Sequence, residues 1–484
     1  MSNPPVRIYK AGVRLVVDSV DPAVIKPLAK VLQYWRREAS ENGRSYTLTK
    51  SAVYTTDAKK RLFTFFGYYE LVVSTLRGAG FESYLEELSP APPRTFETDW
   101  AAVYAHGFNL DDRQSEALAI IATEANGRIA CPPGWGKGVV IEAVPILMPN
   151  ARVAIVVKNL SVLMQRLYPR LSALLPGVGL CYGASKRVGR RVTCYSTGCL
   201  GSSSWNEDLV LVDESHQCGT DIICERLAQF QRARVFGFSA SHDLRSDGGD
   251  FRLLGLTGPI RLQVSYAEAV EAKRVVPVRV IIRRHLYPCD PSEGCHTLVE
   301  FNRMAYWRHE ERNQLIAADA RSYGDDVQVL IYVTTVDHLL RLKALLPEFE
   351  PVYAPSRLSK RNYAAAVDLG LQPMTGERFA AITKQFTTGE IKKVIVTTCW
   401  NVGVDFPQLA VLIRADGGAS DTDAIQVPGR AARVFDGKEY AVLHDYADEF
   451  IHRAEDRGKR RVAAYRRHQW DVRYSAPHEP SLFP

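Results

Sequence analysis

Short apolar runs separated by amphipathic stretches occur in two series along the chain. The first series lies at residues 129–130, 153–157, 209–212 and 235–238, and the second at residues 278–282, 329–333, 394–396, 411–413 and 440–443. Runs of this kind are typical of strands buried on both faces of a parallel sheet, with the amphipathic stretches as covering helices. The pattern therefore predicts an α/β protein with two such sheets in tandem.

The residues before the first series have a different pattern, which predicts a small α+β domain. Residues 13–17 are expected to form a strand. Asp21 and Pro22 then open a helix as its N-cap and first-turn proline, and apolar positions at helical spacing run from Val24 to Trp35. This helix is expected to pack one face against the strand.

Further along this domain, residues 46–54 and 61–66 predict a pair of strands, and residues 69–76 a second helix that ends at Gly78. The region is rich in aromatic residues, which could stack on nucleic-acid bases. Packing in the core is the more common role of such side chains. The aromatic residues in question are Tyr54, Phe63, Phe65, Phe66, Tyr68 and Tyr69.

A proline-rich stretch at residues 89–96 marks the first domain boundary. The expected division is an N-terminal α+β domain (1–95), two α/β domains (96–275 and 276–450) and a basic C-terminal helix or tail (451–484). The last segment carries aromatic residues among Arg and Lys. Contact with nucleic acid and a solvated terminal helix are equally open for it.

Charge and cysteine content indicate the kind of partner and the cellular compartment that suit the protein. The 484 residues include 61 Lys and Arg against 54 Asp and Glu, a net charge of +7 that is compatible with a polyanionic partner. The nine cysteines include no CxxC pair, so we expect free thiols in a reducing compartment and no zinc site or disulfide framework. We find no signal-peptide pattern and no apolar run long enough to span a bilayer. These features predict a cytoplasmic protein.

The sequence IACPPGWGKGVV at residues 129–140 has the layout of a phosphate-binding loop. A strand leads into a glycine-containing turn and then a helix, so backbone N–H groups and the helix N-terminus can face phosphate oxygens. Lys137 lies where the motif lysine reaches the β- and γ-phosphates, and Gly138 stands where the motif has a Ser or Thr that binds Mg²⁺. The candidate ATP-contacting residues of the loop are Pro133, Gly134, Trp135, Gly136, Lys137, Gly138 and Val139.

An acidic pair follows the predicted strand at residues 209–212, in the sequence DESH. Such a pair at the carboxyl end of a strand, downstream of a phosphate loop, suits nucleotide hydrolysis. Asp213 is expected to hold Mg²⁺, and Glu214 to polarise the attacking water. The sequence GFSAS ends the next strand. Its hydroxyl groups could couple the acidic pair to nucleic-acid binding, or they could form a simple turn.

Two arginines, Arg430 and Arg433, occur three residues apart in the sequence QVPGRAAR. This spacing would place both on one face of a helix. An arginine that reaches a triphosphate stabilises the charge developing on the γ-phosphate and is worth roughly 10³–10⁵ in rate. If the motif stood alone, two surface arginines would be the better interpretation.

The order of these sequences resembles that of superfamily 2 helicases and translocases, over residues 108–446. Arg113-Gln114 resembles the adenine-reading glutamine motif. Motifs I, II and III are resembled by CPPGWGKG, DESH and FSAS, in that order. Motifs IV, V and VI are resembled by QVLIYVTT, TTCWNVGVDFP and QVPGRAAR. Six motifs in this order form a specific signature. The resemblance implies two tandem RecA-like domains that bind ATP and Mg²⁺.

The resemblance also implies a role for individual residues. Lys137, Asp213, Glu214, Arg430 and Arg433 would form the catalytic set, and Arg113, Gln114, Gly403, Asp405 and Gln426 would join the loop in binding ATP. Lys158, Asn159, Thr197, Gly198 and Thr398 would contact the nucleic-acid backbone. Contacts of this type position nucleic acid without reading its sequence.

Finer features are similar to XPB-like helicases and to the phage recombination helicases of the UvsW type. After motif III the chain reads LRSDGGDFRLLGLTGPI, in which residues 245–247 resemble the Arg-Glu-Asp triplet of the XPB-like group, with Ser in place of Glu. The approach to motif V, GERFAAITKQFTTGEIKKVIVTT, is similar to that group as well. Gln426 opens motif VI, where DEAD-box RNA helicases usually have His. A small α+β module ahead of the motor also fits this group.

The sequence departs from the helicase pattern at three places. Gly138 lacks the Mg²⁺-binding hydroxyl, Val427 replaces the arginine common in motif VI, and residues 356–375 are inserted before motif V. The insertion begins with basic residues, so a strand-gripping element and a tolerated surface insertion are equally open. Because Mg²⁺ readily keeps waters in its shell, a water could replace the missing ligand. We therefore expect an active ATPase.

The leading hypothesis is an ATP-driven DNA helicase or translocase that remodels branched intermediates in recombination, repair or replication. Its partner would be single-stranded or branched DNA, bound with little sequence specificity. An RNA helicase is one alternative. The other is a nucleic-acid clamp whose degenerate Mg²⁺ site does not support hydrolysis.

Overall fold

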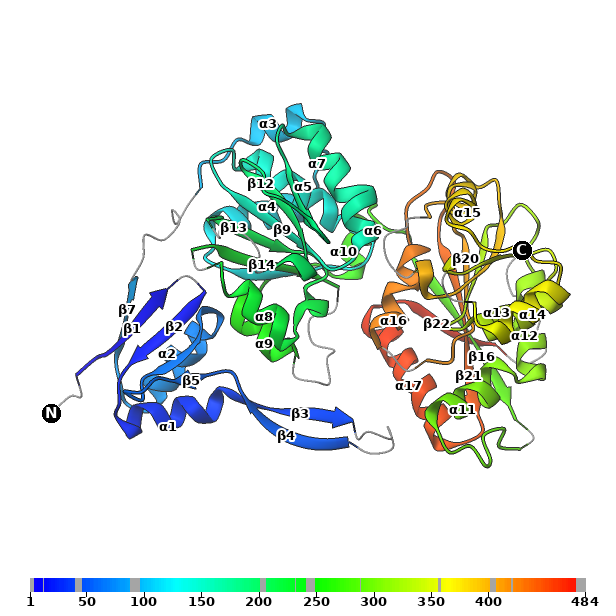
Figure 1. Ribbon diagram of the computed structural model, residues 1–484, viewed down its shortest axis with the longest axis horizontal. Coiled ribbons are helices and arrows are strands. Elements are labelled where there is room, and N and C mark those ends of the chain that lie inside the picture. The colour runs from blue at the N-terminus through cyan, green and yellow to red at the C-terminus, as the bar shows by residue number, and fades with distance from the viewer. Residues whose placement is uncertain are drawn as a thin grey trace. The chain divides into compact units, whose positions relative to one another are not determined.

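The computed structural model describes residues 4–11, 13–39, 46–87, 96–200, 206–230, 232–240, 249–287, 289–355, 358–400, 406–418 and 421–475. The chain forms two compact units, which comprise most of residues 1–264 and most of residues 265–484. Each unit contains a large, mainly parallel sheet, and the first also contains a small sheet near the N-terminus (Figure 1). Within the described residues, no helix is long and apolar enough to cross a membrane.

The N-terminal part of the first unit is a five-stranded sheet packed against two helices. Its strands are β1 (Val6–Ala11), β2 (Arg14–Asp18), β5 (Thr55–Thr56), β6 (Leu62–Phe65) and β7 (Ser83–Glu87), in the order β5-β6-β2-β1-β7. The helices are α1 (Pro22–Val31) and α2 (Tyr69–Gly78). Asp21 caps α1 as predicted, since its side chain accepts the N–H of Ala23 at 2.8 Å. Val24 and Leu28 of α1 lie in the same core as Tyr68, which is fully buried.

The structure corrects two of the predictions for this domain. The first helix ends at Val31, and the chain continues as β3 (Gln33–Ala39), which forms a separate hairpin with β4 (Tyr46–Ala52). Trp35 pairs with Lys50 across this hairpin and is 63% exposed, so it is no part of the helix face. The expected strand pair is also wrong, because β6 pairs with β2 and β5. Cross-strand backbone hydrogen bonds between distant segments outweigh the local helical spacing here.

Most of the aromatic side chains of this domain serve its packing. Tyr54, Phe65, Phe66 and Tyr69 are partly buried against the core, which favours the core interpretation over base stacking. Tyr68 also donates a hydrogen bond to the backbone oxygen of Phe251 in α9 (Gly249–Thr257), and their rings lie 5.0 Å apart. The N-terminal sheet is thus joined to the larger sheet of the same unit.

The larger sheet of the first unit has eight strands in the order β11-β10-β12-β9-β13-β14-β8-β15, and only the β10–β11 pair is antiparallel. The strands are β8 (Gly127–Ala130), β9 (Val153–Val157), β10 (Gly179–Tyr182), β11 (Ser185–Arg187), β12 (Val192–Ser196), β13 (Leu209–Val212), β14 (Arg234–Ser239) and β15 (Ile260–Gln263). Besides α9, the helices are α3 (Trp100–Ala105), α4 (Asp112–Thr123), α5 (Lys137–Leu147), α6 (Leu160–Val162), α7 (Tyr168–Leu174) and α8 (Asp221–Leu227).

The second unit has a seven-stranded, fully parallel sheet in the order β18-β19-β17-β20-β21-β16-β22. Its strands are β16 (Val278–Leu286), β17 (Val329–Tyr332), β18 (Glu350–Val352), β19 (Lys393–Val396), β20 (Val411–Arg414), β21 (Ala441–Glu449) and β22 (Asp471–Ser475). Its helices are α10 (Tyr266–Glu271), α11 (Leu298–Asn302), α12 (Glu310–Arg321), α13 (Val336–Leu345), α14 (Lys360–Asp368), α15 (Gly376–Thr388), α16 (Asp421–Gln426) and α17 (His452–Arg467).

The C-terminal segment is part of this second sheet. One face of α17 is buried, including Ala454, Val462 and Tyr465, and β22 extends the sheet by pairing with β16. The inserted stretch before motif V contains α14, whose Tyr363 and Val367 are both more than half exposed. The insertion therefore forms a surface helix.

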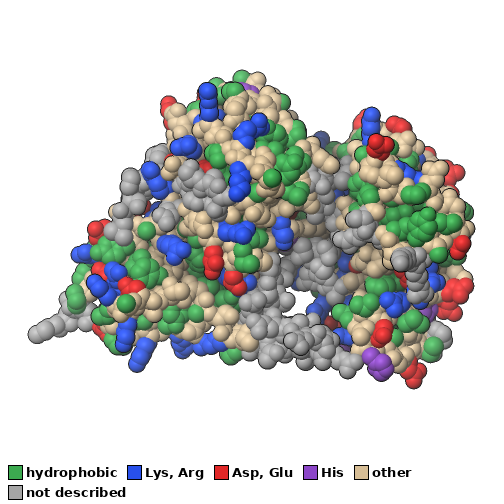
Figure 2. Space-filling model, viewed as in Figure 1, with side chains coloured by type: hydrophobic (Ala, Val, Ile, Leu, Met, Phe, Trp, Pro, Cys, Tyr) green, Lys and Arg blue, Asp and Glu red, His purple; other side chains and the backbone are tan. Residues whose placement is uncertain are grey.

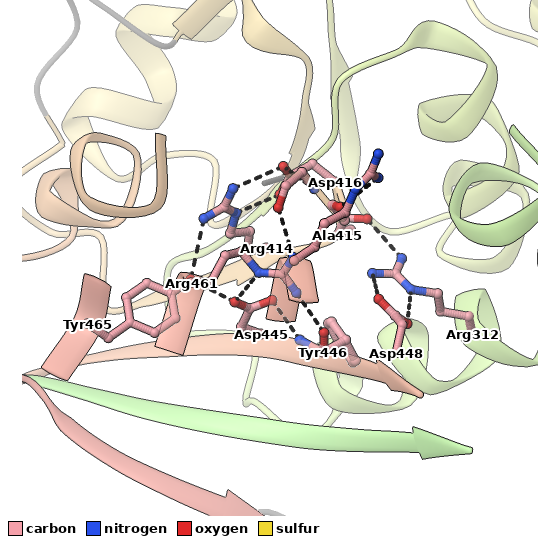
Figure 3. A network of polar contacts seen from close by, with 12 residues as sticks. Arg312, Arg414, Ala415, Asp416, Asp445, Tyr446, Asp448, Arg461 and Tyr465 are labelled. Carbon is pink, nitrogen blue, oxygen red and sulfur yellow. Dashed lines mark hydrogen bonds and ion pairs between the residues drawn. The ribbon is translucent and has the colours of Figure 1, made fainter. Parts of the chain in front are cut away.

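Buried ion pairs join the elements of the second unit, and Figure 3 labels those of Arg312, Arg414 and Arg461. They are Arg312–Asp448 (2.8 Å), Arg414–Asp416 (2.7 Å), Arg461–Asp445 (2.8 Å) and Arg283–Asp319 (2.6 Å), and all eight side chains are at most 5% exposed. Desolvation would raise the pKa of Asp416, but the Arg414 charge outweighs it and lowers that pKa to about 2. Arg461 lies on α17 and Asp445 on β21, so the network fixes the C-terminal helix to the sheet.

The predicted α/β architecture is confirmed, since each unit contains one large, mainly parallel sheet with helices. All nine predicted apolar runs lie in strands β8, β9, β13, β14, β16, β17, β19, β20 and β21, with ends shifted by a few residues. Strands β10, β11, β12, β15, β18 and β22 were not predicted, because they are short or carry polar residues.

Candidate functional site

The loop between β8 and α5 has the backbone geometry that phosphate binding requires. Gly134 and Gly136 have φ angles of +94° and +109°, in the left-handed region that favours glycine. A Cβ atom on Gly136 would also lie 2.5 Å from the Nε2 atom of Gln114. Trp135 is 1% exposed and anchors the turn, and α5 begins at Lys137. Backbone N–H groups at a helix start can donate hydrogen bonds to an anion.

Lys137 joins the loop to the acidic pair. Its Nζ atom lies 2.5 Å from Oε1 of Glu214, and the two side chains are 12% and 25% exposed. Asp213 and Glu214 directly follow β13, near the centre of the sheet. Glu214 has a φ of +47°, which is unusual for a residue with a side chain, and its N–H bonds Oδ1 of Asp213 at 3.0 Å. This cation and two carboxylates are the groups that ATP and Mg²⁺ would meet.

The electrostatics of the cluster leave Asp213 easy to protonate. Desolvation and the Glu214 charge raise the pKa of Asp213 to about 6, although Lys137 opposes them. Desolvation would lower the pKa of Lys137, but the two carboxylates outweigh it and raise that pKa. Lys137 is therefore charged at neutral pH, and a bound Mg²⁺ would relieve the repulsion between the acids. The carboxylates thus fit the hard cation that the fold implies.

We expect Asp213→Asn to stabilise the Mg²⁺-free and nucleotide-free protein at pH 8 but not at pH 4. The pKa of Asp213 is raised to about 6 in the folded state, so its contribution to stability is lost as the pH rises from about 4 through 6. Asn removes this charge and keeps the oxygen that accepts the Glu214 N–H. The gain at pH 8 should be at most about 3 kcal/mol. Thermal unfolding at both pH values checks it, and equal destabilisation at both would contradict it.

The end of β14 contacts the acidic pair through a histidine. Nδ1 of His216 lies 2.8 Å from Oγ of Ser239 and 3.4 Å from Oε2 of Glu214. His216 and Ser239 are both buried. Ser239 thus reaches the acidic pair through His216, while its coupling to nucleic-acid binding stays a prediction. Ser241 lies outside the described residues.

Arg113 and Gln114 lie at the start of α4, beside the loop. Gln114 is fully buried and forms a capping box with Asp111, whose Oδ1 accepts the Gln114 N–H at 2.8 Å. Arg113 pairs with Glu116 and donates to the backbone oxygen of Gln263 at 2.9 Å. The side chain of Gln114 thus packs on the glycine turn that would hold the phosphates.

The motif V and VI residues of the second unit are only partly described. Thr398 begins a short 3₁₀ helix after β19, and Gln426 is the last residue of α16. Gly403 and Asp405 lie outside the described residues, as do residues 245–247.

The prediction that Arg430 and Arg433 share a helix face is wrong. Arg430 ends a 3₁₀ turn at Pro428–Arg430, and Arg433 lies in an isolated bridge with Val275. Pro428 has no N–H group to continue α16, so the helix cannot extend to Arg433.

The expected nucleic-acid contacts of the first unit gather at one sheet edge. Lys158 and Asn159 follow β9, and Thr197 and Gly198 follow the neighbouring strand β12. The Lys158 side chain is exposed, whereas the Asn159 side chain accepts the N–H of Val162 at 3.2 Å. Parallel strands bring these residues together because their carboxyl ends meet at the same edge.

Sequence reasoning missed two features. The guanidinium of Arg166 lies against Gly138. No local sequence pattern links an arginine in SVLMQRLY to the phosphate loop. His285, His309 and Glu311 each bring one potential metal-binding atom within 4.8 Å of the others. Glu311 is exposed, and Nδ1 of His309 already accepts the N–H of Arg312. His285 is distant in sequence from His309 and Glu311, so the sequence alone did not bring the three together.

The chain is similar to known helicases in both sequence and fold. The helicase conserved C-terminal domain family matches residues 310–435. "Putative helicase 22" of the Sulfolobus islandicus filamentous virus (isolate Iceland/Hveragerdi) is 20% identical over 249 residues, which are 50% of this chain and 42% of that protein. This relative is thus matched over less than half of its length.

Two solved structures extend the comparison. T4 UvsW is 14% identical with a TM-score of 0.40, over 98% of this chain and 99% of that chain. S. cerevisiae Dbp5 bound to RNA and ADP BeF3 is 13% identical with a TM-score of 0.53, over 78% of this chain and 93% of that chain. The Dbp5 likeness is one of fold. Together with the two mainly parallel sheets, it confirms the expected fold class of two tandem RecA-like domains, and the helicase conserved C-terminal domain match lies in the second of them.

Proposed function

We propose that this protein is an ATP-dependent DNA helicase or translocase that remodels branched DNA. The observation that carries the proposal is the contact between Lys137 of the phosphate loop and Glu214 of the acidic pair. This contact brings a phosphate-binding cation and a candidate general base to one point at the carboxyl ends of β8 and β13.

Each residue of this cluster has a definite task in the proposed reaction. Lys137 would bind the β- and γ-phosphates, and Glu214 would orient and deprotonate the attacking water. Asp213 would hold Mg²⁺, which supplies charge neutralisation on the phosphate oxygens. Arg430 and Arg433 would stabilise charge developing on the γ-phosphate. Gln114, packed on Gly136, would lie near the adenine.

Nucleic acid would be bound through its phosphates. Lys158, Asn159, Thr197, Gly198 and Thr398 are the proposed contacts. Figure 2 shows Lys and Arg side chains spread over the visible face of the first unit. Binding of this kind is weakly sequence-specific and strongly salt-dependent. The N-terminal domain would add a preference for branched structures, a role that rests on resemblance to the UvsW type.

Two sequence features favour DNA over RNA as the proposed substrate. Gln426 opens motif VI where DEAD-box RNA helicases usually have His, and the approach to motif V is similar to XPB-like proteins. An RNA substrate is the second candidate, favoured by the fold shared with the RNA-bound Dbp5 structure.

A side-by-side ATPase and unwinding assay tests these proposals. We expect single-stranded, forked and four-way DNA to stimulate ATP hydrolysis more than matched RNA, with the greatest unwinding on branched DNA. Lys137→Ala sets the background rate. Stronger stimulation by RNA would favour the RNA helicase. ATP binding without turnover above the Lys137→Ala rate would instead favour the non-hydrolysing clamp.

A further inference from the structure

Gly138 is in direct contact with an arginine from a neighbouring segment. A Cβ atom on Gly138 would lie 2.9 Å from Nη2, 3.4 Å from Cζ and 3.8 Å from Nε of Arg166. All three atoms belong to the guanidinium group, so this group lies over the Cα atom of Gly138. A Ser or Thr side chain at residue 138 would start from the same space. The guanidinium of Arg166 therefore lies against the space from which a Ser or Thr side chain would start.

The backbone around Arg166 and a neighbouring ion pair hold this residue beside the phosphate loop. Arg166 lies in a π-helical segment, Leu163–Leu167, that follows β9 and α6. Segments of this type change the direction of side chains and are frequent at functional sites. One turn further along, Arg170 forms an ion pair at 2.9 Å with Glu142 of α5, whose side chain is 1% exposed. This ion pair fixes the segment against the helix that begins at the phosphate loop.

Arg166 differs from Arg170 in making no ion pair, although its charge also acts to lower the pKa of the buried Glu142 carboxyl against the larger effect of desolvation. In the part of the chain that the structure describes, Arg166 makes no hydrogen bond or ion pair, and it is half-buried. Its charge reaches the acidic pair, since it acts to lower the pKa of Asp213 against the larger effects of desolvation and Glu214. A half-buried arginine beside a phosphate loop and a Mg²⁺-binding acid is suited to an anion.

We propose that Arg166 binds the phosphates of the nucleotide from the side of Gly138, and so supplies positive charge where other members of the family use a hydroxyl-bound Mg²⁺. The inference rests on the proposed function and deepens it. The planar guanidinium donates several N–H groups to phosphate oxygens, which a single hydroxyl cannot do. Glycine at residue 138 leaves the room that this arrangement needs. Nucleotide binding then depends less on Mg²⁺ than in a motor with Ser or Thr at this position.

The test is the affinity for fluorescent ATP, ADP and adenosine, measured with Mg²⁺ and with EDTA. We expect Arg166→Ala to weaken ATP and ADP binding in EDTA by about 10- to 100-fold, the value of one charge-assisted hydrogen-bond pair. Adenosine binding should not change. The loss should be smaller with Mg²⁺, and Arg166→Lys should recover part of it. The matched control is Arg190→Ala, which removes an exposed arginine of the same unit.

A second variant pair tests the link between the two residues. Gly138→Ser alone should weaken binding in EDTA, because the new side chain displaces Arg166. The double variant Gly138→Ser with Arg166→Ala should instead bind ATP in a Mg²⁺-dependent way. Thermal unfolding verifies that each variant is folded.

The possible failures are distinguishable. If Arg166→Ala binds ATP like the wild type in EDTA while Lys137→Ala does not, the inference is wrong and the ATP site stands. If the wild type itself binds no ATP, the proposed function and the inference both fail.

Discussion

Replacing Glu214 with glutamine is expected to lower the kcat of nucleic-acid-stimulated ATP hydrolysis by about 10²- to 10⁴-fold. The carboxylate lies within 2.5 Å of Lys137 and 3.4 Å of His216, at the end of a central strand. Glutamine keeps the shape of the side chain but cannot accept a proton from the attacking water. ATP affinity should stay within a few-fold of wild type, because phosphate binding depends on the loop and Lys137. Steady-state hydrolysis and equilibrium ATP binding measure the two effects separately.

The matched control for this variant is Glu116→Gln, which changes an exposed glutamate paired with Arg113. It should leave kcat almost unchanged. A Glu214→Gln protein with a kcat close to wild type would contradict the assignment of Glu214 as the base. A large loss of ATP affinity would show instead that Glu214 acts by positioning Lys137.

Replacing Asp448 with alanine is expected to lower the free energy of unfolding of the second unit by about 3–5 kcal/mol. Asp448 is the ion-pair partner of Arg312, at 2.8 Å, and both side chains are almost fully buried. The variant leaves Arg312 with a hydrogen bond to the backbone oxygen of Ala415 and no counter-charge. Tyr287 also loses its hydrogen bond to Asp448. A buried, uncompensated charge is far more costly than a lost surface contact.

Hydrogen exchange of the β20 and β21 amides reports this loss for the second unit alone. Asp448→Asn, which keeps the oxygen acceptor, should destabilise less than alanine. Asp471→Ala serves as the surface control, because its ion pair with Arg473 is about half exposed and should contribute at most about 1 kcal/mol. Equal effects for Asp448→Ala and Asp471→Ala would mean that water reaches Arg312.

The sequence predicted the parts of the site that lie along single segments. The glycine turn, Lys137 and the start of α5 follow from one stretch, because the left-handed φ angles there favour glycine. The acidic pair was predicted from its place after the apolar run of β13. The two stretches meet because parallel strands end at the same sheet edge, a consequence of the fold class rather than of any one residue.

Predictions from local residue spacing were wrong where long-range strand pairing or a proline set the backbone conformation. Trp35 continues the helical spacing of α1, yet it lies in a hairpin whose other strand begins at Tyr46. Arg430 and Arg433 have helical spacing, but Pro428 ends the helix before them. The predicted basic tail has one face buried in the second unit, because Arg461 forms an ion pair with Asp445 and β22 pairs with β16.

By itself, the sequence determined the two-sheet architecture, the order of the helicase motifs and the absence of a hydroxyl at residue 138. Only the tertiary structure showed which side chain lies beside Gly138. Arg166 and Gly138 are separated by a strand and most of two helices, and their contact depends on how that segment packs against α5. Hydrophobic periodicity and short motifs record local conformation, whereas a contact between distant side chains depends on the packing of the whole sheet.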